Sequence, residues 1–166
     1  MKRRMVQAIA AEPDPVLAFD GRQSAAAAEL QRGVCRALRA LGYAVVTELA
    51  LSNGRRADVV ALSGAGDVLI VEIKSCLLDY ASDGKWHEYL PHCDRLYFAV
   101  APDFPHHVIP EHAGLILADR YGAQLLREPV EERLGAARRK AMMLCFAHAA
   151  ALRLQRHLDP ACGFDV

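Results

Sequence analysis

The sequence lacks the features that mark membrane-spanning and secreted chains. None of its apolar runs reaches the about 18 residues that a membrane-spanning helix needs. Residues 1–11, MKRRMVQAIAA, are basic at the start, but their apolar stretch is too short for a secretory signal peptide. We therefore expect a cytoplasmic protein with no membrane partner.

The sequence also lacks any pattern of cysteines that would build a disulfide framework or a zinc site. Their number is odd, and no CxxC pair or Cys/His cluster at zinc spacing occurs. The simplest interpretation is that these cysteines carry reduced thiols. The five residues are Cys35, Cys76, Cys93, Cys145 and Cys162.

Net charge is absent as well, because 20 Lys and Arg balance 20 Asp and Glu. This balance gives no support to a strongly basic nucleic-acid binder, so any such binding must come from local patches. What is present is ordinary for one globular domain: 166 residues, of which 53% are hydrophobic and 24% charged. We assign the domain to residues 24–166 and predict that residues 1–23, which contain Pro13 and Pro15, form a loosely attached tail.

The first predicted element is a helix that begins after Ser24, a plausible N-cap, and ends at Gly42. Three strands should follow, over residues 43–51, 57–62 and 68–73, because each is apolar and short turn-forming segments separate them. They are expected to pair in order as an antiparallel meander.

After this meander the sequence predicts a loop over residues 75–82 and a short helix over 83–90, capped by Asp83 and ended by Pro91. Residues 95–100, RLYFAV, read as a strand buried on both faces and parallel to strand 68–73 through a right-handed crossover. An edge hairpin over residues 114–118 and 123–126, and a long helix over 131–158, complete an α/β fold.

Three charged residues stand out on the hairpin formed by strands 57–62 and 68–73. If this hairpin folds symmetrically about residue 65, Asp58 lies opposite Glu72. Because side chains alternate along a strand, Asp58, Glu72 and Lys74 share one face, while Val71 and Ile73 point to the other. Two carboxylates and an ammonium in an apolar hairpin are costly unless a metal ion or a substrate needs them.

A third carboxylate, Glu48, lies within the first apolar strand. It approaches Asp58 only if the strand register allows it, and the sequence does not fix that register. Taken alone, Glu48 is as compatible with a solvent-facing position as with a metal ligand.

The spacing of Asp58 and Glu72-Ile73-Lys74 resembles the D...ExK signature of the PD-(D/E)XK nuclease superfamily, with Ala57 in place of the usual proline. The predicted order of helix, antiparallel meander, helix and parallel strand is similar to that superfamily's restriction-endonuclease-like core. The segments GRRADVVAL, VEIKS, KWHEY, CDRLYFAV, GLILADRYGA and AARRKA together resemble the MmcB-like DNA repair family over about residues 30–160.

The resemblance implies a nuclease that hydrolyses DNA phosphodiester bonds during repair and uses Mg²⁺ or Mn²⁺. Hard carboxylate oxygens suit these ions better than zinc. Asp58 and Glu72 are the expected metal ligands, and Lys74 is expected to orient the attacking water or stabilise phosphoryl charge. The superfamily often has a further acidic residue on its first helix, where Glu29 is the only one; Glu48 is the competing candidate for a third ligand and is favoured because its strand adjoins the site. The alternative is a catalytically inactive nuclease fold that acts as a DNA- or protein-binding adaptor, with the acid–lysine pair as a surface ion pair.

Other residues are candidates for contacts around this site. Lys85 and Tyr89, with Trp86 beside them, occupy the place of the Q-x-x-x-Y motif that follows the ExK strand in many superfamily members, although packing in or beside the core is the more ordinary role of the two aromatic residues. The basic candidates for DNA binding are Arg55, Arg56, Arg138, Arg139 and Lys140. For the last three, a solvated helix face is the more ordinary interpretation. Damaged or branched DNA and repair proteins are the expected partners, and two-fold assembly is an expectation from the superfamily.

Overall fold

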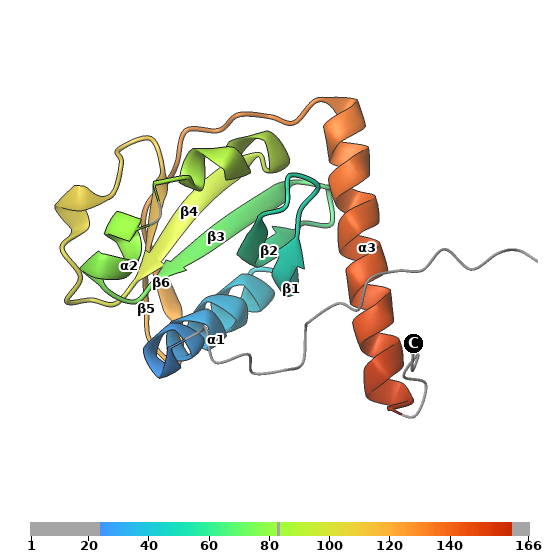
Figure 1. Ribbon diagram of the computed structural model, residues 1–166, viewed down its shortest axis with the longest axis horizontal. Coiled ribbons are helices and arrows are strands. Elements are labelled where there is room, and N and C mark those ends of the chain that lie inside the picture. The colour runs from blue at the N-terminus through green and yellow to red at the C-terminus, as the bar shows by residue number, and fades with distance from the viewer. Residues whose placement is uncertain (1–23, 83, 161–166) are drawn as a thin grey trace, which may run out of the picture.

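A computed structural model describes residues 24–82 and 84–160 of this chain. The predicted tail, residues 1–23, and the predicted cap, Asp83, lie outside the described residues. The described part is an α/β fold in which the first helix packs on one face of a six-stranded mixed sheet, and the long last helix shares the other face with the shorter segments between the strands (Figure 1). The elements are α1 (Ala25–Ala40), β1 (Ala44–Ala50), β2 (Arg56–Leu62), β3 (Val68–Lys74), α2 (Leu77–Ser82), η1 (Trp86–His92), β4 (Arg95–Val100), η2 (His106–Val108), β5 (Gly114–Ala118), β6 (Ala123–Arg127) and α3 (Ala136–Leu158).

Helix α1 is formed as the sequence predicts. The Ser24 hydroxyl accepts a hydrogen bond from the backbone N–H of Ala27, which satisfies one of the free donors at the helix start. The helix ends before Gly42, whose φ of 86° lies in the left-handed region that glycine adopts without strain. Its buried side, which includes Leu30 and Val34, packs on the sheet.

The sheet has the strand order β1-β2-β3-β4-β5-β6, so neighbours in sequence are neighbours in space. Strands β1, β2 and β3 form the predicted antiparallel meander, and β4 pairs with β3 in parallel. Strand β5 is also parallel to β4, and β6 closes the sheet as an antiparallel edge strand. The meander, the parallel pairing of β3 with β4 and the β5–β6 hairpin agree with the sequence-based expectation, whereas the pairing of β5 with β4 was not predicted.

Two segments after the meander differ from the prediction. The predicted loop at residues 75–82 contains α2, which Asp79 initiates by accepting hydrogen bonds from the N–H and hydroxyl of Ser75. The predicted helix at 83–90 is instead the 3₁₀ helix η1, and Pro91 lies inside it. Tyr80 explains the first difference, because its ring packs edge-on against Phe98, a contact between distant residues that local periodicity does not reveal.

Helix α3 begins at Ala136, five residues later than the predicted start at residue 131. Asp94 causes this delay. Its carbonyl accepts from the N–H of Glu132, and its carboxylate accepts from the N–H of Leu134. These bonds hold the preceding segment along the sheet, so its backbone groups are satisfied without a helix.

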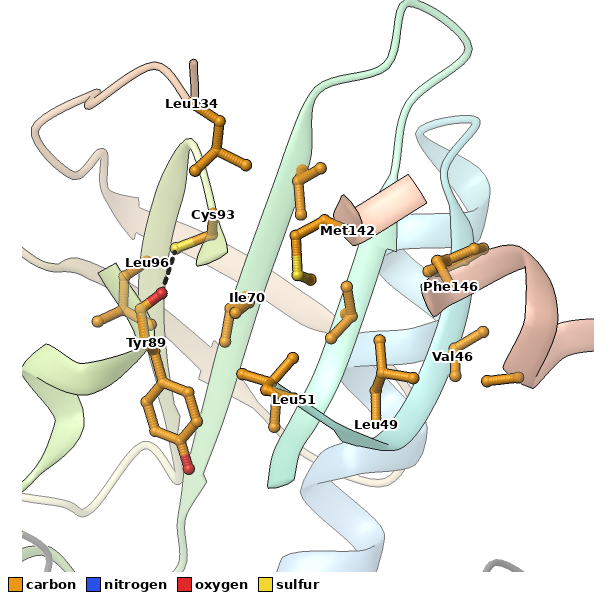
Figure 2. Close-up of a cluster of buried hydrophobic side chains, with 14 residues drawn as sticks. Val46, Leu49, Leu51, Ile70, Tyr89, Cys93, Leu96, Leu134, Met142 and Phe146 are labelled. Atoms are coloured by element: carbon orange, nitrogen blue, oxygen red, sulfur yellow. Dashed lines mark hydrogen bonds between the residues drawn. The ribbon is translucent and has the colours of Figure 1, made fainter. Parts of the chain in front are cut away.

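The two faces of the sheet carry separate cores. On one face, Met142 and Phe146 of α3 pack against Val46, Ile70 and neighbouring side chains (Figure 2). On the other, α1 packs against alternate residues that include Val71. No helix within residues 24–82 and 84–160 is both long and apolar enough to cross a bilayer. The four described cysteines, which are Cys35, Cys76, Cys93 and Cys145, carry free thiols, as predicted.

Candidate active site at one end of the sheet

Asp58 and Glu72 are close neighbours, as the hairpin symmetry predicted. The backbone N–H of Asp58 donates to Glu72 Oε1 at 3.2 Å, and the N–H of Ile73 donates to Asp58 Oδ2 at 2.7 Å. The paired register of β2 and β3 stops just before this point, at Val59 and Val71. The two carboxylates therefore continue the pairing by accepting N–H groups that the ladder leaves free.

Lys74 lies two residues beyond Glu72 on the regular strand β3, so the two side chains share a face. Both residues are buried, with relative exposures of 2% for Glu72 and 4% for Lys74. Val71 and Ile73 belong to the core cluster on the α1 side, as predicted. Buried charged groups are rare unless they are paired or bind an ion, so this end of the sheet differs chemically from the apolar strands around it.

The electrostatic environment of Asp58 is unusual for a carboxyl group. Burial raises its pKa to about 7 from an ordinary value near 3.8, although the hydrogen bond from Ile73 opposes this shift. The charges of Glu48 and Asp79 raise the pKa further, while that of Lys74 lowers it. The carboxyl group of Asp58 thus has a pKa near neutral pH, and a nearby cation would stabilise its charged form.

Glu48 lies in the same row of the sheet, because its neighbours Thr47 and Leu49 pair with Val59 and Ala57 on either side of Asp58. Its φ of 49° is in the left-handed region, which is uncommon for a residue other than glycine. The kink breaks the alternation of β1, since Val46 and Leu49 enter the same core cluster although they are three residues apart. The register that the sequence left open is therefore the one that brings Glu48 beside Asp58.

The Glu48 carboxylate is held by two partners. Gln31 of α1 donates to its Oε1 at 3.3 Å and also to the backbone carbonyl of Asp58 at 3.1 Å. The guanidinium of Arg56 makes an ion pair with its Oε2 at 2.7 Å. On the backbone, Arg153 of α3 donates to the carbonyls of Thr47 and Glu48 and supports the kink. Backbone strain of this kind is often found at functional sites.

The competing candidate, Glu29, makes a different contact. Its carboxylate pairs with Arg120, which follows β5, at 2.6 Å. It is Gln31, two residues along the same helix, that contacts Glu48 and the backbone of Asp58. Of the two acidic residues, the structure therefore places Glu48 beside the Asp58–Glu72 pair.

The donor set at this end of the sheet fits a hard divalent cation in part. Asp58 and Glu72 supply carboxylate oxygens, which Mg²⁺ and Mn²⁺ prefer, and Mg²⁺ is commonly held by one or two carboxylates with water completing the shell. Among residues 24–82 and 84–160, however, no group of three or more His, Cys, Asp or Glu side chains is arranged to hold a metal. Glu48 is thus adjacent to the pair without forming a three-ligand cluster with it.

The two arginines near the turn before β2 both contact acidic residues. Arg55 Nε pairs with Glu88 of η1 at 2.6 Å, and Arg56 pairs with Glu48. The hydrogen bond from Arg55 lowers the pKa of Glu88. Both guanidinium groups remain partly exposed, with side-chain exposures of 28% and 36%. They are part of the surface around the site but are not isolated cations.

The segment that follows α2 supports β2 and β4. Tyr89 is buried and donates its hydroxyl to the backbone carbonyl of Arg56 at 3.2 Å. Trp86 is half-buried, packs edge-on against Phe98, and lies 4.8 Å from the ring of His112. Lys85 is exposed. Tyr89 and Trp86 thus make the packing contacts that were the alternative to a role in the site. Phe98, which pairs with Glu72 in the register of β3 and β4, connects Trp86 to the strand that carries the site.

The late basic cluster divides into inward and outward residues. Arg139 donates through both terminal nitrogens to Asp94, at 2.7 and 2.8 Å, and also binds the carbonyl of Gly66. Asp94 is almost fully buried, so this ion pair belongs to the interior. Arg138 and Lys140 are exposed. The guanidinium of Arg139 is therefore engaged in holding the fold together, and its two neighbours form the solvent-facing part of the cluster.

The sequence reasoning did not identify three residues that shape the site. Gln31 binds Glu48, Asp79 affects the pKa of Asp58, and Arg153 binds the β1 kink. Gln31 and Arg153 come from helices far from β1 in sequence, and no local motif marks them. Asp79 had a local signal, because a carboxylate four residues after Ser75 favours a capped helical turn.

Comparisons with known proteins agree with this architecture. Residues 14–161 match the family described as DNA repair protein MmcB-like. The SPO1766 protein of unknown function from Silicibacter pomeroyi has a similar structure, with a TM-score of 0.81 and 40% sequence identity over 84% of this chain and 97% of that chain. No curated protein matches the sequence. Because the family match extends over most of the chain, the protein belongs to the MmcB-like DNA repair protein family.

Proposed function

We propose that this protein is a metal-dependent nuclease with a restriction-endonuclease-like core that hydrolyses DNA phosphodiester bonds in repair. The observation that supports this most strongly is the Asp58–Glu72 pair, two neighbouring carboxylates next to the buried Lys74. The order α1, antiparallel meander, α2 and parallel β4 supports the core assignment. Membership of a DNA repair family supports DNA as the substrate.

In this proposal Asp58 and Glu72 hold one Mg²⁺ or Mn²⁺ ion, with Glu48 as an outer carboxylate. The bound ion supplies Lewis-acid chemistry, polarising the scissile phosphate and lowering the pKa of water. Lys74 stabilises negative charge on the phosphoryl oxygens or orients the attacking water. Gln31 and Arg56 fix Glu48, and the backbone N–H groups of Asp58 and Ile73 fix the two carboxylates before substrate arrives.

DNA is positioned by basic side chains around the site. Arg55 and Arg56 bracket the start of β2 and are partly exposed, so they can contact phosphates on the strand being cleaved. Arg138 and Lys140 lie farther away, at the start of α3 near the opposite end of β3, where Arg139 binds Gly66 and Asp94, and they contact only the backbone of a longer substrate. Lys85 is exposed on the segment after α2 and extends the same set of contacts.

A second function, a catalytically inactive adaptor that binds DNA or a repair protein, is favoured by a different observation. No group of three metal-ligating side chains occurs in the described residues, and Arg56 already neutralises Glu48. A protein whose site never binds a metal would have the same fold and the same basic surface. The two functions therefore differ first in metal binding and only then in cleavage.

The deciding experiment is calorimetric titration of Mn²⁺ into the wild-type chain and into Asp58→Asn, with a cleavage assay on single-stranded, nicked and branched DNA. We expect the wild type to bind Mn²⁺ and cleave at least one substrate. Asp58→Asn should lose at least about tenfold in Mn²⁺ affinity and about a hundredfold or more in cleavage, because the asparagine cannot supply the charged oxygen.

Glu111→Gln is the matched control, since it also removes one carboxylate charge but lies exposed in the loop before β5. It should bind metal and cleave like the wild type. If the wild type binds DNA but neither binds Mn²⁺ nor cleaves any substrate with any divalent ion, the nuclease proposal is wrong and the adaptor is correct.

A further inference from the structure

Helix α3 has two apolar faces, and only one of them is buried. Met142, Phe146 and Ala149 pack into the core. The opposite side presents a second set of apolar residues, all of them exposed, with relative exposures of 61% for Leu144, 57% for Leu154 and 70% for Leu158. We name this set the outer seam; its members are Leu144, Ala147, Ala151, Leu154 and Leu158.

The outer seam has the spacing of a coiled-coil contact. Its members follow one another at intervals of three, four, three and four residues, the a/d pattern that keeps one stripe facing a partner helix over about 21 Å. The seam contains no charged residue, although a solvated helix face ordinarily carries them. Two arginines of α3 point inward instead, Arg139 to Asp94 and Arg153 to the β1 carbonyls.

The C-terminal nine residues of α3, after Ala149, include no buried side chain, although Arg153 among them still binds the carbonyls of β1. Every residue of α3 that is classed as buried lies at or before Ala149, and the helix continues for nine residues to Leu158 (Figure 1). Leu154 and Leu158 lie in this extension. A helix end with no buried side chain gains little from its own propensity, so an apolar stripe along it is best explained by a partner.

We propose that the partner is a second copy of this chain, and that two α3 helices pair antiparallel along the outer seam to form a two-fold dimer. The seam complements itself when the axis passes at Ala151. Leu154 of one copy then faces Ala147 of the other, and Leu144 faces Leu158, while the two Ala151 residues meet at the axis. Leucines meet at the two ends of the seam, leucine meets alanine between them, and the central alanines allow the helices to approach closely.

Charge favours the same antiparallel arrangement. Helix α3 contains no Asp or Glu, and Lys140 lies at its N-terminal end in line with the seam. Antiparallel pairing brings this lysine near Asp159 at the C-terminal end of the other helix, where the helix dipole also favours a cation. Parallel pairing would place Lys140 against Lys140. The chain has no net charge, so two copies do not repel each other as wholes.

The dimer is independent of the proposed nuclease activity, and sedimentation of the full chain tests it. The wild type should show a concentration-dependent monomer–dimer equilibrium. Leu154→Glu should raise the dimer dissociation constant at least about thirtyfold, because it places two glutamates in an apolar seam. Leu126→Glu, a similarly exposed leucine on β6, is the matched control and should dimerise like the wild type. Circular dichroism confirms that both variants fold.

Charge exchange and cross-linking test the pairing itself. Lys140→Asp and Asp159→Lys should each weaken the dimer, and the double variant should restore it, a result that a different partner would not give. Ala151→Cys should form a disulfide-linked dimer on oxidation beyond the background of the native thiols, whereas Leu144→Cys should not. The proposal is wrong if the wild type stays monomeric at all concentrations, whether or not it binds anionic lipid vesicles instead. It is also wrong if Leu144→Cys cross-links to itself.

Discussion

At the scale of single residues, the burial of Asp58 makes the stability of the protein depend on pH. Asp58 has a pKa of about 7 because burial disfavours its charged form, while the unfolded chain ionises this group near its ordinary value. Between about pH 4 and pH 7 the folded state retains a proton that the unfolded state releases. Stability contributed by Asp58 therefore falls as the pH rises through this window and remains lower above it.

Asp58→Asn should for this reason stabilise the metal-free protein at pH 8, by roughly 1–3 kcal/mol, and have almost no effect below about pH 4. The asparagine carries no charge and can still accept the hydrogen bond from Ile73. Urea unfolding at pH 4 and pH 8, in the presence of a chelator, measures the difference. Loss of stability at pH 8 would show that the Asp58 charge is favourable in the fold, contrary to this account.

At the scale of elements, β1 is an edge strand whose outer side is covered by α3. Exposed edges invite pairing with other chains, and proteins protect them with charged residues or neighbouring elements. Here Arg153 binds the carbonyls of Thr47 and Glu48, so one side chain both covers the edge and supports the kink that directs Glu48 to the site. Strand protection and site geometry thus depend on the same contact.

Arg153→Ala should destabilise the protein by about 1–3 kcal/mol, because two backbone carbonyls of β1 lose a charged donor. Amide hydrogen exchange should accelerate in β1 much more than in the central strand β4. Arg133→Ala is the matched control, since its side chain is 68% exposed and contacts Glu131 at 3.5 Å. Equal acceleration across both strands would indicate global unfolding instead of a local effect on β1.

At the scale of the whole molecule, Asp94 joins parts of the chain that are distant in sequence. Its carboxylate accepts from the N–H of Val68 at the start of β3, from the N–H of Leu134, and from Arg139 of α3. Burial alone would raise the pKa of Asp94, but these hydrogen bonds outweigh it and lower the pKa to about 2. The stabilising contribution is therefore present above about pH 4 and is lost as the pH falls toward 2.

Asp94→Asn should cost about 3–5 kcal/mol at pH 7, since it leaves Arg139 without its charged partner, and should flatten the acid dependence of stability between pH 4 and pH 2. Urea unfolding across this range provides the measurement. The exposed Asp103→Asn should follow the wild-type curve. An unchanged acid dependence in Asp94→Asn would mean that other carboxyl groups control acid unfolding.

Local signals in the sequence were enough to predict the central contact of the candidate site. The turn between β2 and β3 is short, so its symmetry fixed which residues face each other, and Asp58 and Glu72 were predicted as neighbours before any contact was known. The pairing of Glu48 with Arg56 and Gln31 could not be predicted, because the β1 register and its kink depend on contacts made by α1 and α3. The same holds for Arg139, whose charge suggests a surface and whose partner is buried.

The sequence by itself determined the elements whose causes are local: the Ser24 cap and Gly42 end of α1, the meander, and the strand β4. Tertiary structure alone decided where α2 and α3 begin and which charged residues face inward. The physical reason is the range of the interactions. Caps, turns and strand alternation act within a few residues, whereas burial and ion pairing depend on side chains that only the folded chain brings together.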